Sequence, residues 1–205
     1  MLAIKNATLV MKDHLIPEAV LFVEDGLIAG FGEMRTTPIP EGCEVVDAEG
    51  IHTHAGGGYW FYENPDKAAQ FNLINGTTTV LPTLYFNMNS QQLVEQADLI
   101  QKAMKTKECA NIAGFYMEAP YMNPKFGADR ENNPWKGPIC KDEYQPVIDQ
   151  VGTDAKVWVV APERENIEQF AIDCRKANPT VRFSVGHSEA SPQQIEALMP
   201  YGLCI

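Results

Sequence analysis

The chain has 205 residues, of which 45% are hydrophobic, and a formal net charge of −11 at pH 7. This composition is typical of a globular protein that can bury a sizeable core. No run reaches the roughly 18 apolar residues that a bilayer demands, and the first residues alternate rather than form a signal peptide. An acidic surface also disfavours polyanions, so we expect neither nucleic acid nor a membrane as a partner. The five cysteines form no C-x-x-C pair, which favours a reducing cytoplasmic location.

Residues 1 to 50 are expected to form a small β-sheet module. The segment "LAIKNATLV" alternates between apolar and polar residues, and Asp25-Gly26 stands between two apolar runs in "AVLFVEDGLIAGFG". Such a dipeptide between apolar runs predicts a β-hairpin with a two-residue turn. We therefore divide the chain into residues 1 to 50 and a second domain of residues 51 to 205.

From about residue 63 helical and strand-like segments alternate. The segment "NSQQLVEQADLIQKAMKTK" predicts an amphipathic helix, with a cap at Asn89 or Ser90 and apolar residues at helical spacing: Leu93, Ala97, Ile100 and Met104. Further helices are expected near residues 63 to 74, 142 to 150, 165 to 177 and 192 to 199. The apolar runs between them are "TTTVLPTLYF", "NIAGFYM", "KVWVVAP" and "VRFSVGH". They indicate an α/β domain with a parallel sheet, either doubly wound or closed into a barrel.

A long connection, Tyr121 to Cys140, is rich in Pro, Gly and Asn and follows one of the predicted strands. Long loops in compact domains are usually functional or disordered, and α/β folds bind ligands beyond the carboxyl ends of their strands. Its basic residues Lys125, Arg130 and Lys136 are candidates for binding a phosphate. We favour the simpler interpretation that they are solvated loop charges.

His52 and His54 lie in "HTHAGGG" with one residue between them. On a strand, residues i and i+2 point to the same side, so the two imidazoles could chelate one metal ion. The following glycines, Gly56 to Gly58, would leave the approach to such an ion open. By itself an H-x-H pattern is a weak signal.

Glu118 and His187 strengthen this signal, because each directly follows a predicted strand. Taken singly, each has a simpler interpretation that we would favour: Glu118 as a solvated carboxylate at a strand end, and His187 as a residue beside a helix cap. Together with the histidine pair they place metal-capable side chains at three successive strand ends, where barrel enzymes gather their catalytic groups.

The motifs "HTHAGGG", "GTTTVLPTLYF", "GFYMEAPYMNPKFGA", "WVVAPE" and "VGHSEAS" resemble those of N-acetylglucosamine-6-phosphate deacetylases in the amidohydrolase superfamily. The resemblance implies a small β-sandwich module packed on a TIM-type (β/α)8 barrel. It implies metal ligands at His52, His54, Glu118 and His187. It also implies a backbone contact to the amino sugar at Ala128. The next residue, Asp129, stands where members often carry a polar substrate contact such as His, so it is a second candidate for binding the substrate.

The activity implied is metal-dependent hydrolysis of an acetamide to acetate and an amine, on an amino-sugar phosphate as the small-molecule substrate. A bound divalent metal would polarise the carbonyl and acidify the attacking water. Zinc is the first expectation, and iron, manganese or cobalt also suit this ligand set.

Three features depart from the family pattern. Only Ile51 separates "VVDAEG" from "IHTH", so the first barrel strand looks short, and Ala119 replaces the glycine usual after the glutamate. The sequence ends after about five of the eight strands of such a barrel. We expect the catalytic aspartate beyond Ile205, and we expect residues 1 to 205 alone to be poorly active and to need either that missing part or a homo-oligomer.

Two other functions stay open. One is an amidohydrolase that acts on a cyclic amide or another N-acyl substrate. The other is a catalytically inactive homologue with a scaffold role. The motifs "EAPYMNP" and "FGA" favour the amino sugar over the first, and the four ligand-capable residues argue against the second.

Overall fold

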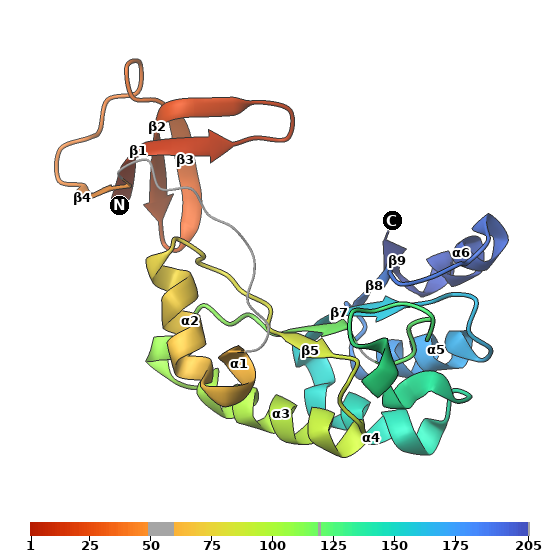
Figure 1. Ribbon diagram of the computed structural model, residues 1–205. Coiled ribbons are helices and arrows are strands. Elements are labelled where there is room, and N and C mark those ends of the chain that lie inside the picture. Colours follow the sequence, from red (N-terminus) through yellow and green to blue (C-terminus); the bar gives the residue numbers. More distant parts are fainter. Residues whose placement is uncertain (49–59, 119, 205) are drawn as a thin grey trace. The chain divides into compact units, whose positions relative to one another are not determined.

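A computed structural model describes residues 1–48, 60–118 and 120–204 (Figure 1). The chain divides into two compact units, Met1–His54 and Ala55–Ile205. The histidine pair at positions 52 and 54 and the glycines at 56 to 58 lie outside the described residues.

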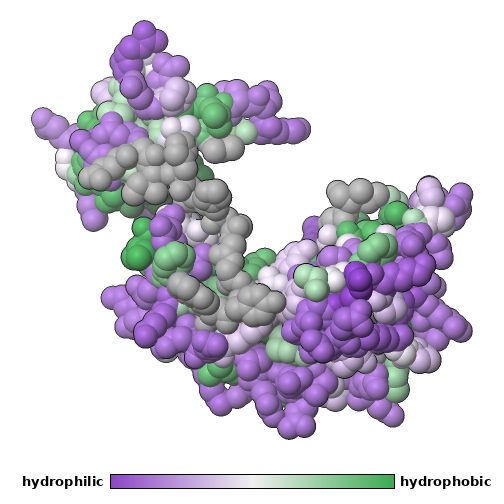
Figure 2. Space-filling model, in the orientation of Figure 1, coloured by the Kyte–Doolittle hydropathy of each residue, from purple (hydrophilic) through white to green (hydrophobic). Residues whose placement is uncertain are grey.

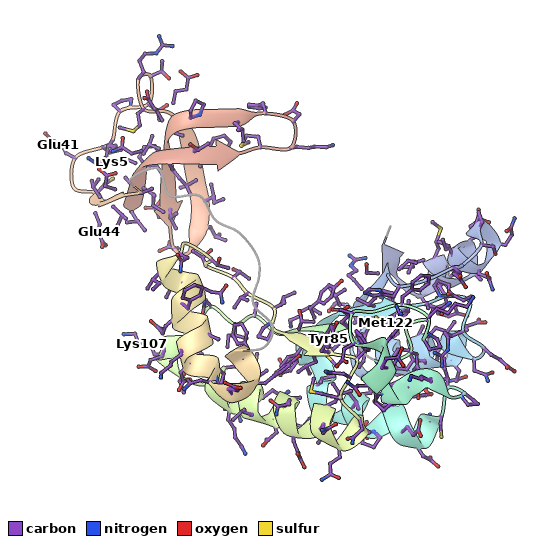
Figure 3. The ribbon with its side chains drawn as sticks, viewed as in Figure 1. Lys5, Glu41, Glu44, Tyr85, Lys107 and Met122 are labelled. Atoms are coloured by element: carbon purple, nitrogen blue, oxygen red, sulfur yellow. The ribbon has the colours of Figure 1, made fainter. Side chains whose placement is uncertain are left out.

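The first unit contains a four-stranded sheet in the order β3-β2-β1-β4. Its strands are β1 (Leu2–Val10), β2 (Leu15–Glu24), β3 (Leu27–Glu33) and β4 (Glu44–Asp47). β2 pairs antiparallel with β1 and β3, whereas β4 runs parallel to β1 and is joined to it by an ion pair between Lys5 and Asp47 at 3.2 Å (Lys5 is labelled in Figure 3). Within residues 1–48 the structure shows this one sheet, so the second sheet of the expected β-sandwich stays a prediction.

The β2–β3 hairpin turns at Asp25 and Gly26, as predicted. Both residues have positive φ angles, 51° and 77°. Two successive positive φ values are the requirement of the type I′ turn, whose twist matches that of the flanking strands. The Asp-Gly signal is therefore confirmed.

The second unit is built on a five-stranded sheet in which every pairing is parallel. The strands are β5 (Thr83–Tyr85), β6 (Phe115–Glu118), β7 (Ala155–Val160), β8 (Arg182–Val185) and β9 (Leu203–Cys204). Their order in space, β5-β6-β7-β8-β9, is their order in the chain. Doubly wound sheets reverse their order at a switch point, whereas barrels do not. The parallel sheet is confirmed, and the described strands show no reversal of order; closure of the sheet into a barrel stays a prediction.

Six helices and five short 3₁₀ turns connect these strands in the described residues. The helices are α1 (Trp60–Glu63), α2 (Pro65–Ile74), α3 (Ser90–Ala103), α4 (Lys141–Val151), α5 (Ile167–Ala177) and α6 (Pro192–Leu198). The 3₁₀ turns are η1 (Lys107–Cys109), η2 (Arg130–Asn132), η3 (Pro134–Lys136), η4 (Gly152–Asp154) and η5 (Met199–Tyr201). The predicted cap of α3 is confirmed, because the Asn89 side chain accepts from the Gln92 N–H at 3.0 Å and the Gln92 side chain accepts from the Asn89 N–H at 2.9 Å.

The helices α3, α4 and α5 pack on one face of the sheet (Figure 1). Phe170 of α5 lies edge-to-face with Trp158 of β7 and Tyr144 of α4, at ring-centroid distances of 5.3 and 5.1 Å. In β6 the buried residues Phe115 and Met117 belong to this core, and Glu118, next in the strand, is only partly buried. Since successive strand residues point to opposite faces, Glu118 points away from the helix layer.

The surface over α3 and α4 is mostly hydrophilic (Figure 2). Among the described residues, no helix combines the length and the apolar character needed to cross a lipid bilayer.

Candidate functional site

The carboxyl ends of β6 and β8 bring Glu118 and His187 together. Glu118 is the last residue of β6, and His187 follows β8 by two residues. The Glu118 Oε1 and His187 Nε2 atoms lie 3.0 Å apart, although 69 positions separate the two residues in the sequence. Their side chains are 21% and 37% exposed, so ligands from solvent can reach the pair.

His187 occupies a constrained backbone position. Its φ angle is 49°, in the left-handed region that non-glycine residues seldom adopt. A side chain at the preceding Gly186 would overlap Val159 of β7, so the chain leaves β8 in close contact with its neighbour. The Asn123 N–H donates to the His187 carbonyl at 3.0 Å. Neighbouring loops therefore fix the direction in which the imidazole points.

Glu163, in the loop after β7, accepts three hydrogen bonds beside this pair. The donors are the Ser188 hydroxyl at 2.6 Å, the Glu189 N–H at 2.7 Å and the Asn123 side-chain amide at 2.8 Å. Burial by itself raises the pKa of the Glu163 carboxyl, but these hydrogen bonds outweigh burial and lower the pKa below its usual value. Glu163 is therefore a carboxylate at neutral pH.

The predicted substrate residues, Ala128 and Asp129, follow Gly127, which packs against a ring near His187. Gly127 has a φ angle of 101°, and a side chain there would overlap the ring of Phe86. The Phe86 ring in turn lies 6.5 Å from the His187 ring, measured between centroids. Ala128 is exposed, as a backbone contact to a ligand would require.

Asp129 uses both carboxylate oxygens to fix its own loop. It accepts from the Asn87 amide at 2.7 Å on one oxygen and from the Asn132 amide at 2.7 Å on the other. Asn87 follows β5, so these bonds attach the long loop to the end of that strand. This arrangement is that of a residue that orients the loop, and a direct contact between Asp129 and a substrate stays a prediction.

The three basic residues of the long loop each have a local partner. The Lys125 Nζ lies 2.5 Å from the Glu189 carboxylate, and the Lys136 Nζ donates to the Glu131 carbonyl at 2.9 Å. The Arg130 Nε lies 3.6 Å from the Glu131 carboxylate. These pairings agree with the interpretation of the three residues as loop charges.

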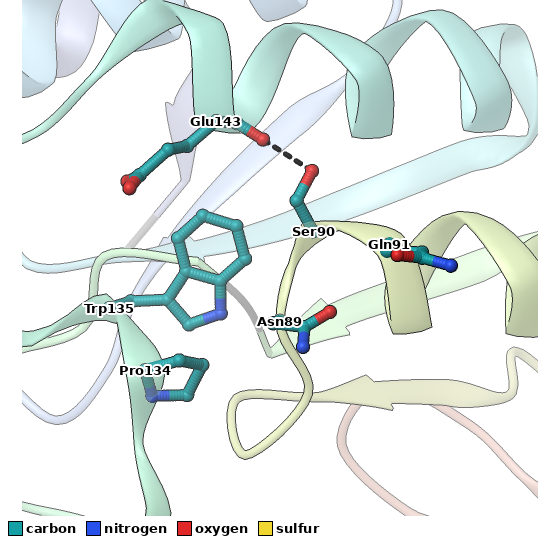
Figure 4. A pocket seen from close by; sticks show the side chains of 6 residues that line it. All are labelled: Asn89, Ser90, Gln91, Pro134, Trp135 and Glu143. Carbon is teal, nitrogen blue, oxygen red and sulfur yellow. Dashed lines mark hydrogen bonds between the residues drawn. The ribbon is translucent and has the colours of Figure 1, made fainter.

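A cavity of about 290 Å³ lies at the amino ends of α3 and α4 and is lined by Asn89, Ser90, Gln91, Pro134, Trp135 and Glu143 (Figure 4). The Ser90 hydroxyl donates to the Glu143 carbonyl at 2.6 Å across it. Neither Glu118 nor His187 lines this cavity, so it is separate from the pair at the strand ends.

Glu118 and His187 are the two predicted metal ligands that the structure describes. Two ligands bonded at about 2.0–2.1 Å to one tetrahedral ion lie roughly 3.3 Å apart, which is close to the observed spacing. Within residues 1–48, 60–118 and 120–204, no three His, Cys, Asp or Glu side chains gather around a point that could hold an ion. A complete ligand set therefore depends on the predicted His52 and His54, and the role of all four residues stays a prediction.

Sequence reasoning missed Glu163, Asn123 and Ser188. The signal available for Glu163 was its position in "WVVAPE", directly after an apolar run, where Glu118 also stands in its own motif. Asn123 and Ser188 carried no comparable signal, because their contacts reach across loops far apart in the sequence.

The sequence matches no protein-family model and no curated protein. Solved structures do match. The N-acetyl-D-glucosamine-6-phosphate deacetylase of Mycobacterium smegmatis superposes with a TM-score of 0.70 at 20% identity, over 99% of this chain and 54% of that one. The corresponding enzyme of Pasteurella multocida gives 0.68 at 19% identity, over 98% and 55%. That of Thermotoga maritima gives 0.66 at 20% identity, over 98% and 53%.

The chain thus spans about half the length of the solved structures that it matches. The resemblance stated from the sequence motifs is confirmed at the level of the fold. Nearly the whole of this chain has the α/β fold of N-acetylglucosamine-6-phosphate deacetylases.

Proposed function

We propose that the protein is a metal-dependent amidohydrolase of the N-acetylglucosamine-6-phosphate deacetylase family. Its reaction would release acetate and an amine from N-acetylglucosamine 6-phosphate or a related amino-sugar phosphate. The observation that carries the proposal is the 3.0 Å approach of Glu118 to His187 at the carboxyl ends of β6 and β8. The fold likeness and the ordered motifs support it.

The proposed ligands are His52, His54, Glu118 and His187. A bound divalent metal, zinc first and iron, manganese or cobalt as alternatives, supplies a positive charge that polarises a carbonyl and acidifies water. Glu118 brings the negative charge that partly neutralises such an ion. The backbone at His187 orients the imidazole, so little reorganisation is needed when the ion binds.

The proposed substrate segment contributes through its backbone. Gly127 packs against Phe86, whose ring lies near that of His187, and the next residue, Ala128, is exposed. The amide bonds to Asp129 fix the loop in this position. A loop held before the ligand arrives loses less conformational entropy on binding, which favours affinity for a small polar substrate.

The partner that we propose is a small-molecule substrate in the cytoplasm. β5 and β9 are the outer strands of the described sheet, and outer strands need cover from another segment or chain. We propose that a homo-oligomer, or a further part of the protein corresponding to the rest of the matched structures, provides this cover.

Metal analysis of the purified chain tests the proposal. We expect about one zinc, iron or manganese ion per chain, and binding of N-acetylglucosamine 6-phosphate that is weakened when the chain is stripped with a chelator. No bound metal under metal-replete conditions would contradict the proposal and favour the scaffold alternative.

An acetate-release assay tests the substrate. General acid–base catalysis contributes roughly 10²- to 10⁴-fold, so residues 1–205 should turn over at least about 100-fold more slowly than a complete enzyme. Ring opening of a cyclic amide is measured in parallel. Faster hydrolysis of the cyclic amide than of the amino sugar would favour the alternative amidohydrolase function. A rate typical of whole enzymes would refute our placement of the acid–base residue beyond Ile205.

A further inference from the structure

We propose that Glu163 and Arg164 are positioning residues, which we name the β7 clamp, and that they set the spacing between Glu118 and His187. This inference rests on the proposed function, because the spacing matters only if the two side chains share a ligand. Neither residue has a role in the reaction proposed above, either as a metal ligand or as a contact to the substrate.

The topology creates the need for such a clamp. β7 lies between β6 and β8 in the sheet, so Glu118 and His187 stand on strands that do not pair with each other. Their side chains meet beyond the end of β7, and the loop that follows β7 begins between them. A residue in that loop can therefore contact the segments after both strands at once.

Arg164 anchors the segment that follows Glu118. Its Nη1 donates to the Met122 carbonyl at 2.8 Å, and its Nη2 donates to the carbonyls of Trp135 at 3.1 Å and Gly137 at 2.5 Å. The guanidinium carbon also lies 5.7 Å from the centre of the Tyr121 ring. Figure 3 shows Met122 in the same part of the second unit as Tyr85 at the end of β5. Arg164 thus fixes both ends of the long loop.

Glu163 anchors the segment that follows His187. Two of its three donors, the Ser188 hydroxyl and the Glu189 N–H, belong to the residues directly after that histidine. The third donor is the Asn123 amide, and the Asn123 backbone N–H binds the His187 carbonyl. One carboxylate therefore ties both loops to the end of β7.

The left-handed backbone conformation of His187 depends on the hydrogen bonds that Glu163 accepts. A non-glycine residue keeps a positive φ only where its surroundings hold it there. The bonds from Glu163 fix the two residues that follow, so their loss would let the turn relax. The imidazole would then leave the position in which its Nε2 lies 3.0 Å from Glu118.

Zinc affinity, measured by competition with a chromogenic chelator, tests the clamp. Glu163→Ala should weaken zinc binding by about 10- to 100-fold, the range found for residues that orient metal ligands. Glu163→Gln should recover part of the loss, because its amide oxygen still accepts the Glu189 N–H. The matched control is Glu165→Ala, which removes an exposed carboxylate from the same loop and should leave the affinity unchanged.

A double-mutant cycle distinguishes positioning from general stabilisation. If Glu163 acts through His187, then Glu163→Ala should cause no further loss of zinc affinity in a His187→Ala background. Equal losses in both backgrounds would overturn the inference. So would a folded Glu163→Ala chain with wild-type affinity, and both of these outcomes leave the proposed function standing.

Failure of the proposed function gives a different result, namely a wild-type chain that binds no zinc at all. Circular dichroism and thermal melting establish that each variant is folded. If Glu163→Ala does not fold, Ser188→Ala removes the hydroxyl that donates to Glu163 and accepts from the Ala190 N–H, and we expect a loss of about 3- to 10-fold. An unchanged affinity in that variant would equally overturn the clamp.

Discussion

Two carboxylates in the second unit show how the same chemistry serves different regions of the molecule. Asp173 lies in the helix layer, is 4% exposed, and accepts hydrogen bonds from charged and neutral donors: Lys141, Lys176, Tyr144 and Gln169. Glu163 lies at the strand ends and accepts only from neutral donors. Both carboxyl groups have lowered pKa values, although burial opposes the shift in each.

The difference lies in what each group connects. The partners of Asp173 come from α4 and α5, so its bonds join two helices on the side of the sheet away from Glu118. The partners of Glu163 come from the loops that carry the proposed site. A change in the helix layer should therefore lower stability and spare metal binding, whereas a change in the strand-end loops should affect the site directly.

The largest effect is expected at Gly127. Gly127→Ala places a methyl group against the buried Phe86 ring at a positive φ angle, and overpacking and backbone strain each cost about 1–3 kcal/mol. We expect a loss of roughly 2–4 kcal/mol in the free energy of unfolding and weaker zinc binding. The matched control is Gly137→Ala in the same loop, where a side chain meets open space. Equal stability of the two variants in urea denaturation would contradict this packing.

A smaller effect is expected at Asp173. Asp173→Ala leaves the Tyr144 hydroxyl buried without its acceptor, which costs about 1–3 kcal/mol, while the two lysines stay solvated. We expect a loss of roughly 2–3 kcal/mol with zinc affinity unchanged. Asp98→Ala removes an exposed pair with Lys102 and should cost less than about 0.5 kcal/mol. A fall in zinc affinity for Asp173→Ala would remove the contrast between the two regions.

The smallest effect is expected in the pH dependence of the stability that Asp173 contributes. Burial raises the pKa of the Asp173 carboxyl, but the bonds from Lys141, Lys176 and Tyr144 outweigh it and hold the pKa well below its ordinary value of 3.8. A carboxyl with a lowered folded pKa stabilises fully above its unfolded pKa and loses that contribution as the pH falls below it. The difference in stability between wild type and Asp173→Asn should be constant from pH 5 to 7 and shrink below about pH 4. A difference that grew on acidification would reverse this sign.

Much of the local structure of both units follows from local patterns in the sequence. The Asn89 cap, the Asp25-Gly26 turn and the helical spacing through Leu93 and Ile100 each depend on residues close in the chain, and the structure confirms these elements. The approach of Glu118 to His187 was also accessible, because parallel strands end at one edge.

The strand order and the clamp were not accessible in this way. Continuous apolar runs show that strands are buried, but they carry no information about which strand lies beside which. Arg164 reads as an ordinary loop charge, yet its guanidinium binds carbonyls 27 to 42 positions away. Contacts of this kind depend on the completed fold and leave no periodic trace in the sequence.

Zinc binding to the purified chain, compared between wild type and His187→Ala, tests the central claim most directly. Glu118→Ala should behave like His187→Ala, and His14→Ala, which changes an exposed histidine of the first unit, is the control. We expect wild type and control to bind about one ion with equal affinity, and both site variants to bind at least about 100-fold more weakly. Equal affinity in all four chains would show that Glu118 and His187 do not share a cation.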